Sequence, residues 1–324
     1  MYERVAEVWR GELVESVHFG NAVAVDAEGW VLRAVGSPDE PMYPRSANKP
    51  LQASAMVRAG LSLEPELLAL TCASHAGQDF HVDGVRRILA GSGLSELDLR
   101  CTPDYPLDED VRRAHLAAGR DRAPVYANCS GKHAAMLATC VHNGWSTRSY
   151  LKADHPLQRR IRRTIDELAG ESAGHVAVDG CGAPLFGFSL TGLARSFAAL
   201  LRAEPGSSEH TVAEAMRGNP EWVDGTGRAV TGLITGLPGA VAKSGAEGVL
   251  ALAVPGGPAV AVKIADGAQR ATTVVLIALL TDLGVDVTGV SGLAKVDVLG
   301  HGRPVGAVRP AAFATALTGG PRDE

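Results

Sequence analysis

The sequence predicts an α+β fold in which one antiparallel sheet is built from both ends of the chain and packs against helices. Three observations support this prediction. Short β-prone runs separated by turn residues occupy residues 4–36, helical patterns fill residues 46–236, and β-prone runs return over residues 240–310. Strands at both ends with helices between them are typical of one sheet carrying a mostly helical layer. We therefore expect a single domain over residues 1–324.

The first strands form a predicted meander. Gly11, Gly20-Asn21 and Gly29 favour turns, and they separate four short β-prone runs. These runs cover residues 5–9, 14–18, 22–25 and 31–35.

The middle of the chain is predicted to be helical from Ser46 onward. Leu51, Ala55 and Ala59 recur at helical spacing, and Gly60 is a typical helix end. Similar patterns predict helices at residues 82–91, 109–119, 131–143, 157–169, 186–203, 209–217 and 226–235. The closing segments are predicted as strands at 241–243, 249–254 and 259–264, a helix at 267–283 and a last strand at 305–308.

Composition argues against several classes of partner. The chain has 31 basic and 36 acidic residues, a net charge of −5, and no basic run interleaved with aromatic residues, so we expect no nucleic-acid partner. The one concentrated positive cluster, residues 159–163, is typical of the solvated face of a helix. With no run of 18 apolar residues and no signal-peptide pattern, we expect no membrane span and no export. Five scattered cysteines suit a reducing cytoplasm.

A serine and a lysine stand three residues apart at the start of the first predicted helix. Ser46 and Lys49 would share one helical face, so the amine can meet the hydroxyl. A serine hydroxyl becomes a good nucleophile when a base takes its proton, and lysine serves as that base when its pKa falls towards neutrality. Ser149 and Lys152 repeat the spacing in a predicted loop, where it does not bring side chains together.

A second lysine motif, Lys243-Ser244-Gly245, lies on a predicted strand near the C-terminus. Ser-x-x-Lys on a helix followed by Lys-Ser/Thr-Gly on a strand is the pairing of serine β-lactamases and penicillin-binding proteins. Taken alone, Lys243 could be an exposed strand lysine. The two motifs together favour nucleophilic catalysis.

The segment 72–78 places Ser74 and His75 in a turn of small residues, where side chains can point into a cleft. Ser74 is a candidate proton relay, and the alternative is a turn residue or a cap for the helix predicted near residue 82. His75 and His81 are either metal ligands or hydrogen-bonded structural residues.

Two cysteine-bearing turns complete the candidate chemistry. Cys129, Lys132 and His133 stand just before an apolar helix, whose free N–H groups suit anion or substrate binding. Cys181 lies between two glycines, two residues after Asp179. Cys129 and Cys181 are candidate ligands of a soft cation such as Zn²⁺, although their spacing is not that of a zinc finger. The alternative is a pair of packed, reduced thiols.

Five blocks, taken in order, resemble the rhizobial-type L-asparaginases, the asparaginase II family. The resemblance extends over roughly residues 5–310, and one departure is Ala135, where the family pattern has glycine. The blocks are Arg-Ser-Ala-Asn-Lys-Pro at 45–50, Cys-Ala-Ser-His at 72–75, Asn-Cys-Ser-Gly-Lys-His at 128–133, Asp-Gly-Cys-Gly at 179–182 and Lys-Ser-Gly-Ala-Glu-Gly at 243–248.

The resemblance implies a β-lactamase/glutaminase-like fold and a cytoplasmic enzyme that hydrolyses L-asparagine to L-aspartate and ammonia. It implies that Ser46 is the nucleophile with Lys49 as its base, and that Ser74 and Lys243 form a second pair that moves protons. It also implies a Zn²⁺ site, no organic cofactor, and a homodimer. The implied metal ligands are Cys129, Lys132 and Cys181, and the residues implied to hold substrate or orient the metal cluster are Arg45, His133 and Asp179.

Two other readings are compatible with parts of the pattern. A β-lactamase or D,D-peptidase would share both lysine motifs, but those enzymes act outside the cytoplasm and their pattern lacks the Cys129 and Cys181 blocks. A non-catalytic metal-binding relative would keep the fold without the chemistry. The joint presence of two serines and two lysines in the expected order argues against that reading.

Overall fold

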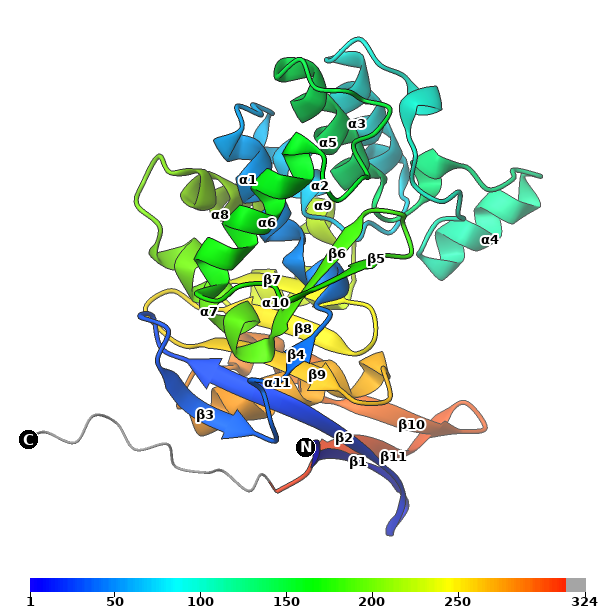
Figure 1. The fold of residues 1–324 in the computed structure, drawn as a ribbon. Coiled ribbons are helices and arrows are strands. Elements are labelled where there is room, and N and C mark those ends of the chain that lie inside the picture. The colour runs from blue at the N-terminus through cyan, green and yellow to red at the C-terminus, as the bar shows by residue number, and fades with distance from the viewer. Residues whose placement is uncertain (313–324) are drawn as a thin grey trace, which may run out of the picture.

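The computed structural model describes residues 1–312, so residues 313–324 of the predicted domain lie outside the described part of the chain. Its main sheet has eight antiparallel strands in the order β10-β11-β1-β2-β9-β8-β7, with β3 paired to β2 (Figure 1). The strands come from both ends of the chain, which confirms the predicted α+β class with one antiparallel sheet built from both termini. Their bounds are β1 (Glu3–Arg10), β2 (Leu13–Val25), β3 (Val31–Val35), β7 (Val241–Gly245), β8 (Val249–Ala253), β9 (Ala259–Ile264), β10 (Val296–Gly300) and β11 (Arg303–Pro310).

Strand β2 joins the N-terminal and C-terminal parts of the sheet. Its first half pairs with β1, and from Gly20 onward it pairs with β9. A Cβ at Gly20 would lie 2.5 Å from the carbonyl oxygen of Lys263, so only glycine permits this approach. The sequence predicted a turn at Gly20-Asn21, which is wrong, because these residues continue the strand.

Helices cover both faces of the sheet at strands β8 and β9. Every residue of β8 is buried, and successive strand side chains point to opposite faces, so neither face is open to solvent. Helices α7 (Leu190–Arg202) and α11 (Thr272–Asp282) both contact β8 and β9. By contrast, the residues of β10 alternate between half-buried and exposed.

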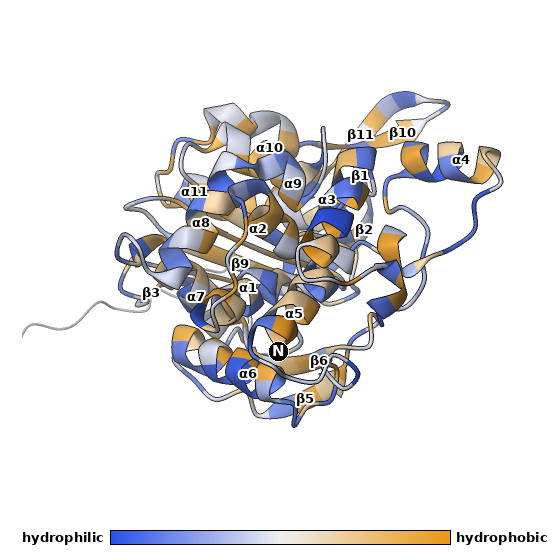
Figure 2. Cartoon of the chain, turned by 90° about the horizontal axis from the view of Figure 1, so that it is seen from above, coloured by the Kyte–Doolittle hydropathy of each residue, from blue (hydrophilic) through white to orange (hydrophobic). Residues whose placement is uncertain are grey.

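The middle of the chain forms a helical layer above the sheet (Figure 1). Arg159 and Arg163 are exposed on α6, which buries Leu157, Ile161 and Ile165, and Figure 2 shows hydrophilic residues along this helix. The positive cluster is therefore the solvated helix face predicted.

Within residues 1–312, no helix is long and apolar enough to cross a membrane. The other helices are α1 (Lys49–Arg58), α2 (Pro65–Thr71), α3 (Asp79–Ala90), α4 (Glu109–Ala117), α5 (Ser130–His142), α6 (Pro156–Ala169), α8 (Ser208–Gly218), α9 (Pro220–Val223) and α10 (Ala229–Gly236).

Several predicted boundaries are wrong. The helix predicted at 186–203 begins at Leu190, because Ser189 caps it by accepting a hydrogen bond from the N–H of Gly192 at 2.8 Å. The preceding residues form β6 (Pro184–Ser189), which joins β4 (Pro41–Met42) and β5 (His175–Val178) in a second, three-stranded sheet. Strand β10 and helix α9 were not predicted. Ser46 lies in the 3₁₀ turn η1 (Arg45–Asn48), and α1 begins only at Lys49, where Pro50 suits the first turn.

Candidate active site

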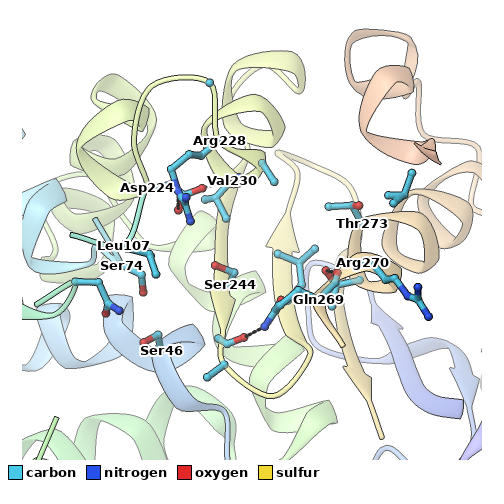
Figure 3. A pocket seen from close by; sticks show the side chains of 18 residues that line it. Ser46, Ser74, Leu107, Asp224, Arg228, Val230, Ser244, Gln269, Arg270 and Thr273 are labelled. Atoms are coloured by element: carbon cyan, nitrogen blue, oxygen red, sulfur yellow. Dashed lines mark hydrogen bonds and ion pairs between the residues drawn. The ribbon is translucent and has the colours of Figure 1, made fainter. Parts of the chain in front are cut away.

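A cavity of about 660 Å³ opens where η1, β7 and the segment before α10 meet (Figure 3). Ser46 reaches it from η1, Ser74 from the turn after α2, and Ser244 from β7. Asp224 and Arg228 line the opposite side. Polar groups from separate elements that converge on one cavity are typical of a substrate site.

Two buried lysines converge on the hydroxyl of Ser74. The Nζ of Lys243 lies 2.9 Å from Ser74 Oγ, and the Nζ of Lys49 lies 3.2 Å from the same atom. Lys49 also donates to the carbonyl oxygen of Ala73 at 2.5 Å, and Lys243 donates to that of Ser244 at 2.8 Å. The structure therefore brings together three of the four predicted catalytic residues through direct hydrogen bonds.

Burial makes both amines easy to deprotonate. It lowers the pKa of Lys49 to about 8, although the neighbouring Cys129 opposes this shift. It lowers the pKa of Lys243 to about 7, and repulsion by Lys49 adds to the effect. Near neutral pH much of Lys243 and a smaller fraction of Lys49 are uncharged, and the uncharged amine is the state that accepts a proton.

The close approach of β7 to the Ser46 turn depends on a glycine. A Cβ at Gly245 would lie 2.4 Å from the carbonyl oxygen of Pro44 and 3.0 Å from the N–H nitrogen of Ala47. The small residue in the Lys243-Ser244-Gly245 motif thus allows the strand and η1 to touch. This contact places the two lysine motifs beside one cavity.

Ser46 is half-buried and lines the cavity (Figure 3). Its hydroxyl makes no hydrogen bond to any of residues 1–312, because Lys49 is directed at Ser74 instead. The second Ser-x-x-Lys lies in a turn, as predicted, where the N–H of Lys152 donates to the carbonyl oxygen of Ser149 at 2.9 Å.

The alternative role for Ser74 as a helix cap is not observed. Gln78 occupies the N-terminal cap position of α3. His75 pairs with the Ser130 hydroxyl through Nε2 at 2.8 Å, and the Nε2 of His81 lies 2.9 Å from the carbonyl oxygen of Glu221. Both histidines thus take the structural role among the described residues.

Three side chains gather at a candidate metal centre. The ligand atoms of Cys129, His133 and Cys181 all lie within 4.8 Å of one another, and all three residues are buried. His133 pairs through Nδ1 with the hydroxyl of Tyr150 at 2.8 Å, while its buried Nε2 has no partner in the described chain. An oriented imidazole with a free ring nitrogen next to two thiols fits the donor set that Zn²⁺ prefers.

The charge state of this cluster also suits a soft cation. A hydrogen bond with Cys129, together with the nearby positive charge of Lys132, holds the pKa of the Cys181 thiol far below its usual range. Lys132 donates to Cys181 Sγ at 3.3 Å. Burial lowers the pKa of Lys132, but the Cys181 and Cys129 thiols outweigh it and raise the pKa overall. Lys132 would have to lose this proton to become a metal ligand.

Asp179 contacts Cys181 of the metal cluster and holds Arg45, and neither residue lines the described cavity. Arg45 donates through Nε to Asp179 Oδ1 at 2.8 Å, and Cys181 Sγ lies 3.8 Å from Asp179 Oδ2. This geometry supports an orienting role for the pair. A role in holding substrate stays a prediction for Arg45, His133 and Asp179.

Sequence reasoning missed four residues of the site. Tyr150 orients His133, and Cys101 is hydrogen-bonded to Cys129, a contact that lowers the pKa of Cys101. Asp224 and Arg228 line the cavity. A charged pair that flanks the run Gly-Thr-Gly was the sequence signal for the last two residues.

Comparison with known proteins places this sequence in a family. A sequence profile described as L-asparaginase II matches residues 6–310. The chain belongs to the L-asparaginase II family. No curated protein sequence matches the chain.

Solved structures similar to this L-asparaginase II family member have low sequence identity to it. Mglu in its native form is 14% identical over 83% of this chain and 65% of its own, with a TM-score of 0.46. Mglu in its L-glutamate binding form in the presence of 4.3 M NaCl is 15% identical over 83% of this chain and 61% of its own, with a TM-score of 0.45. The chain thus spans less than two thirds of the length of these structures.

Proposed function

We propose that this protein is an L-asparaginase that hydrolyses L-asparagine to L-aspartate and ammonia through an acyl-enzyme. The observation that supports this most directly is the Ser74 hydroxyl held between two buried lysines, beside Ser46, in one cavity. Membership of the L-asparaginase II family supports a small amide as the substrate of these residues. A relay of this kind supplies what amide hydrolysis needs, an activated nucleophile and a proton for the departing nitrogen.

In the first step, Ser46 Oγ attacks the side-chain amide carbon of asparagine. Its proton passes to uncharged Lys49 and from there, through the Ser74 hydroxyl, to the amide nitrogen, so that Lys49 is uncharged again after this step. The carbon–nitrogen bond then breaks, ammonia leaves, and a β-aspartyl ester remains on Ser46. The N–H of Ser46 lies in the first turn of η1 and has no acceptor within that turn, so it can stabilise the oxyanion, a contribution of about 3 kcal/mol per donor.

In the second step, water opens the ester. The amine that received the first proton takes one from water as the water oxygen attacks the ester carbon. The ester bond breaks, Ser46 recovers its proton, and L-aspartate leaves. Lys243 keeps Ser74 in place for both steps through its 2.9 Å hydrogen bond.

The same proposal includes a Zn²⁺ site. Cys129, His133 and Cys181 would hold the ion, with Lys132 as a further ligand after loss of its proton. A bound Zn²⁺ would supply positive charge and Lewis acidity near the cavity. A cytoplasmic homodimer is also proposed, and sedimentation of the purified protein tests the dimer.

The decisive assay measures ammonia release from L-asparagine and L-glutamine, with and without a chelator, by the wild type and Ser46→Ala. We expect Ser46→Ala to lose at least about 10³-fold in kcat, while Ser149→Ala, from the loop copy of the motif, keeps wild-type turnover. Mass spectrometry of rapidly quenched wild type should show an aspartyl group on Ser46. Normal turnover by Ser46→Ala would refute the mechanism.

The two alternatives have distinct outcomes in this assay. A β-lactamase-like hydrolase would cleave a chromogenic β-lactam and release no ammonia from either amide. A non-catalytic relative would do neither and would still bind Zn²⁺ tightly. The cysteine cluster beside the cavity disfavours the first, and the two lysines with lowered pKa values disfavour the second.

A further inference from the structure

We infer that Arg228, held in place by Asp224, is the residue that binds the α-carboxylate of the substrate. This inference rests on the proposed function and names the carboxylate contact that the function requires. Arg228 lines the same cavity as Ser46 and Ser74 (Figure 3). It lies outside every sequence block used above.

Asp224 leaves the guanidinium of Arg228 available to a ligand. The Nε of Arg228 donates to Asp224 Oδ1 at 3.0 Å, and Asp224 Oδ2 accepts the N–H of Val230 at 3.1 Å. The Asp224 side chain is only 5% exposed, whereas that of Arg228 is 30% exposed. Neither terminal guanidinium nitrogen of Arg228 has a hydrogen-bond partner within residues 1–312. Such a fork matches the geometry of a carboxylate.

Backbone hydrogen bonds hold the segment that carries Arg228 beside the segment that carries Ser74. The N–H of Ser74 donates to the carbonyl oxygen of Val223 at 3.1 Å, and the N–H of Ala76 donates to that of Asp224 at 2.8 Å. Gly225 has φ 140°, and a Cβ there would lie 2.5 Å from the Cβ of Ala76. The segment that carries Arg228 therefore packs directly on the segment that carries Ser74.

Two other arginines near the cavity are already engaged. Arg45 is paired with Asp179 at 2.8 Å and lies 3.7 Å from Glu247, so its charge is offset by two carboxylates. Arg270 donates to His18 at 3.0 Å, and Figure 3 shows its side chain directed away from the cavity. Arg228 is offset by one carboxylate and faces the space where substrate would bind.

This placement specifies the substrate class. A free α-carboxylate would be required, so free amino acids that carry a side-chain amide would be accepted. Asparagine within a peptide lacks that carboxylate and would be rejected, because the terminal guanidinium nitrogens of Arg228 would then have no partner.

The experiment compares L-asparagine with β-alaninamide, which is asparagine without its carboxylate. Turnover of both amides and calorimetric binding of the product L-aspartate are measured for the wild type, Arg228→Gln, Arg228→Lys and Arg45→Gln. Arg270→Gln is the matched control, and melting curves confirm that each variant folds.

We expect Arg228→Gln to lower kcat/KM for L-asparagine by about 10- to 100-fold, to leave β-alaninamide turnover unchanged, and to weaken L-aspartate binding at least about tenfold. The losses in Arg228→Lys should be smaller than those in Arg228→Gln, because lysine keeps the charge but lacks the forked guanidinium. Arg270→Gln should bind L-aspartate as the wild type does, and Arg45→Gln should weaken L-aspartate binding less than Arg228→Gln does.

The outcomes separate this inference from the proposed function. If the wild type hydrolyses L-asparagine and Arg228→Gln matches it in turnover and in L-aspartate binding, the inference is wrong and the proposed function stands. If the wild type releases no ammonia but binds L-aspartate through Arg228, the proposed function fails and the carboxylate site stands. Absence of L-aspartate binding by the wild type, or its loss in Arg45→Gln alone, would also overturn the inference.

Discussion

At the residue scale, the chemistry depends on two amines that share one hydroxyl. Lys49 is 1% exposed and Lys243 is fully buried, and both point at Ser74. Burial disfavours the charged form of each, and two charged amines on one oxygen would repel each other. Burial and mutual repulsion therefore favour the uncharged form of both lysines without a carboxylate partner.

This arrangement predicts how activity depends on pH. An amine accepts a proton only when uncharged, so kcat/KM should rise with pH through an apparent pKa between the values of about 7 for Lys243 and about 8 for Lys49. The measurement is initial ammonia release from about pH 6 to about pH 9. A flat profile over that range would contradict a lysine base.

A permanent charge at position 243 should stop the relay. Lys243→Arg places a permanent cation beside Ser74, and its repulsion disfavours the charged Lys49 that forms when Ser46 is deprotonated, so kcat should fall by about 10²- to 10⁴-fold. Lys152→Arg, from the loop copy of the serine-lysine motif, is the control and should behave as wild type. Equal activity of both variants would show that an uncharged Lys243 is not needed.

Tyr150 should tune the proposed metal site without being a ligand. Its hydroxyl pairs with His133 Nδ1 at 2.8 Å, which leaves Nε2 aimed at the thiols. Tyr150→Phe removes this partner, so Zn²⁺ affinity should fall by about 10- to 100-fold in competition with a chromophoric chelator. The exposed Tyr2→Phe is the control. Unchanged Zn²⁺ affinity in Tyr150→Phe would exclude His133 as an oriented ligand.

At the scale of elements, the site depends on contact between η1 and β7. The residues that carry the two lysine motifs are nearly 200 positions apart in the chain, and Gly245 is where their elements meet. Because a Cβ there would lie 2.4 Å from the carbonyl oxygen of Pro44, any side chain at this position must push the strand from the turn. The same strand presents Ser244 to the cavity.

Gly245→Ala should therefore impair turnover more than folding. A shift of β7 would misplace Lys243 relative to Ser74, and an error of about 1 Å can cost about 10²-fold in rate. Overpacking should also lower stability by about 1–3 kcal/mol. Gly218→Ala is the matched control, because a Cβ there meets nothing within 4 Å. Wild-type kcat in a folded Gly245→Ala protein would show that the contact is dispensable.

At the scale of the whole molecule, one apolar core connects the sheet and the helical layer. Leu276 of α11 packs below the sheet, Met136 of α5 lies in the helical middle, and both belong to the same buried cluster. Within the sheet, strand β2 joins the two ends of the chain, since it is hydrogen-bonded to β1 and to β9. This continuity supports the prediction of a single domain.

Cooperative unfolding tests that prediction. Leu276→Ala and Met136→Ala should each lower stability by about 2–5 kcal/mol, and both should shift one shared thermal transition. Leu97→Ala should change stability by less than about 0.5 kcal/mol, because Leu97 is 92% exposed. Two separate transitions, each sensitive to only one of the core substitutions, would indicate two domains.

The sequence by itself determined the α+β class, the placement of strands at both ends, and the residues of both lysine motifs. These features are local, since strand alternation, helical spacing and Ser46–Lys49 depend on neighbours in the chain. Tertiary structure decided which groups meet. That Ser74 lies between the two lysines, that His133 faces Cys129 and Cys181, and that Arg228 enters the cavity all depend on approaches between distant segments. Such approaches are set by packing and by close contacts such as that of Gly245, which no local pattern encodes.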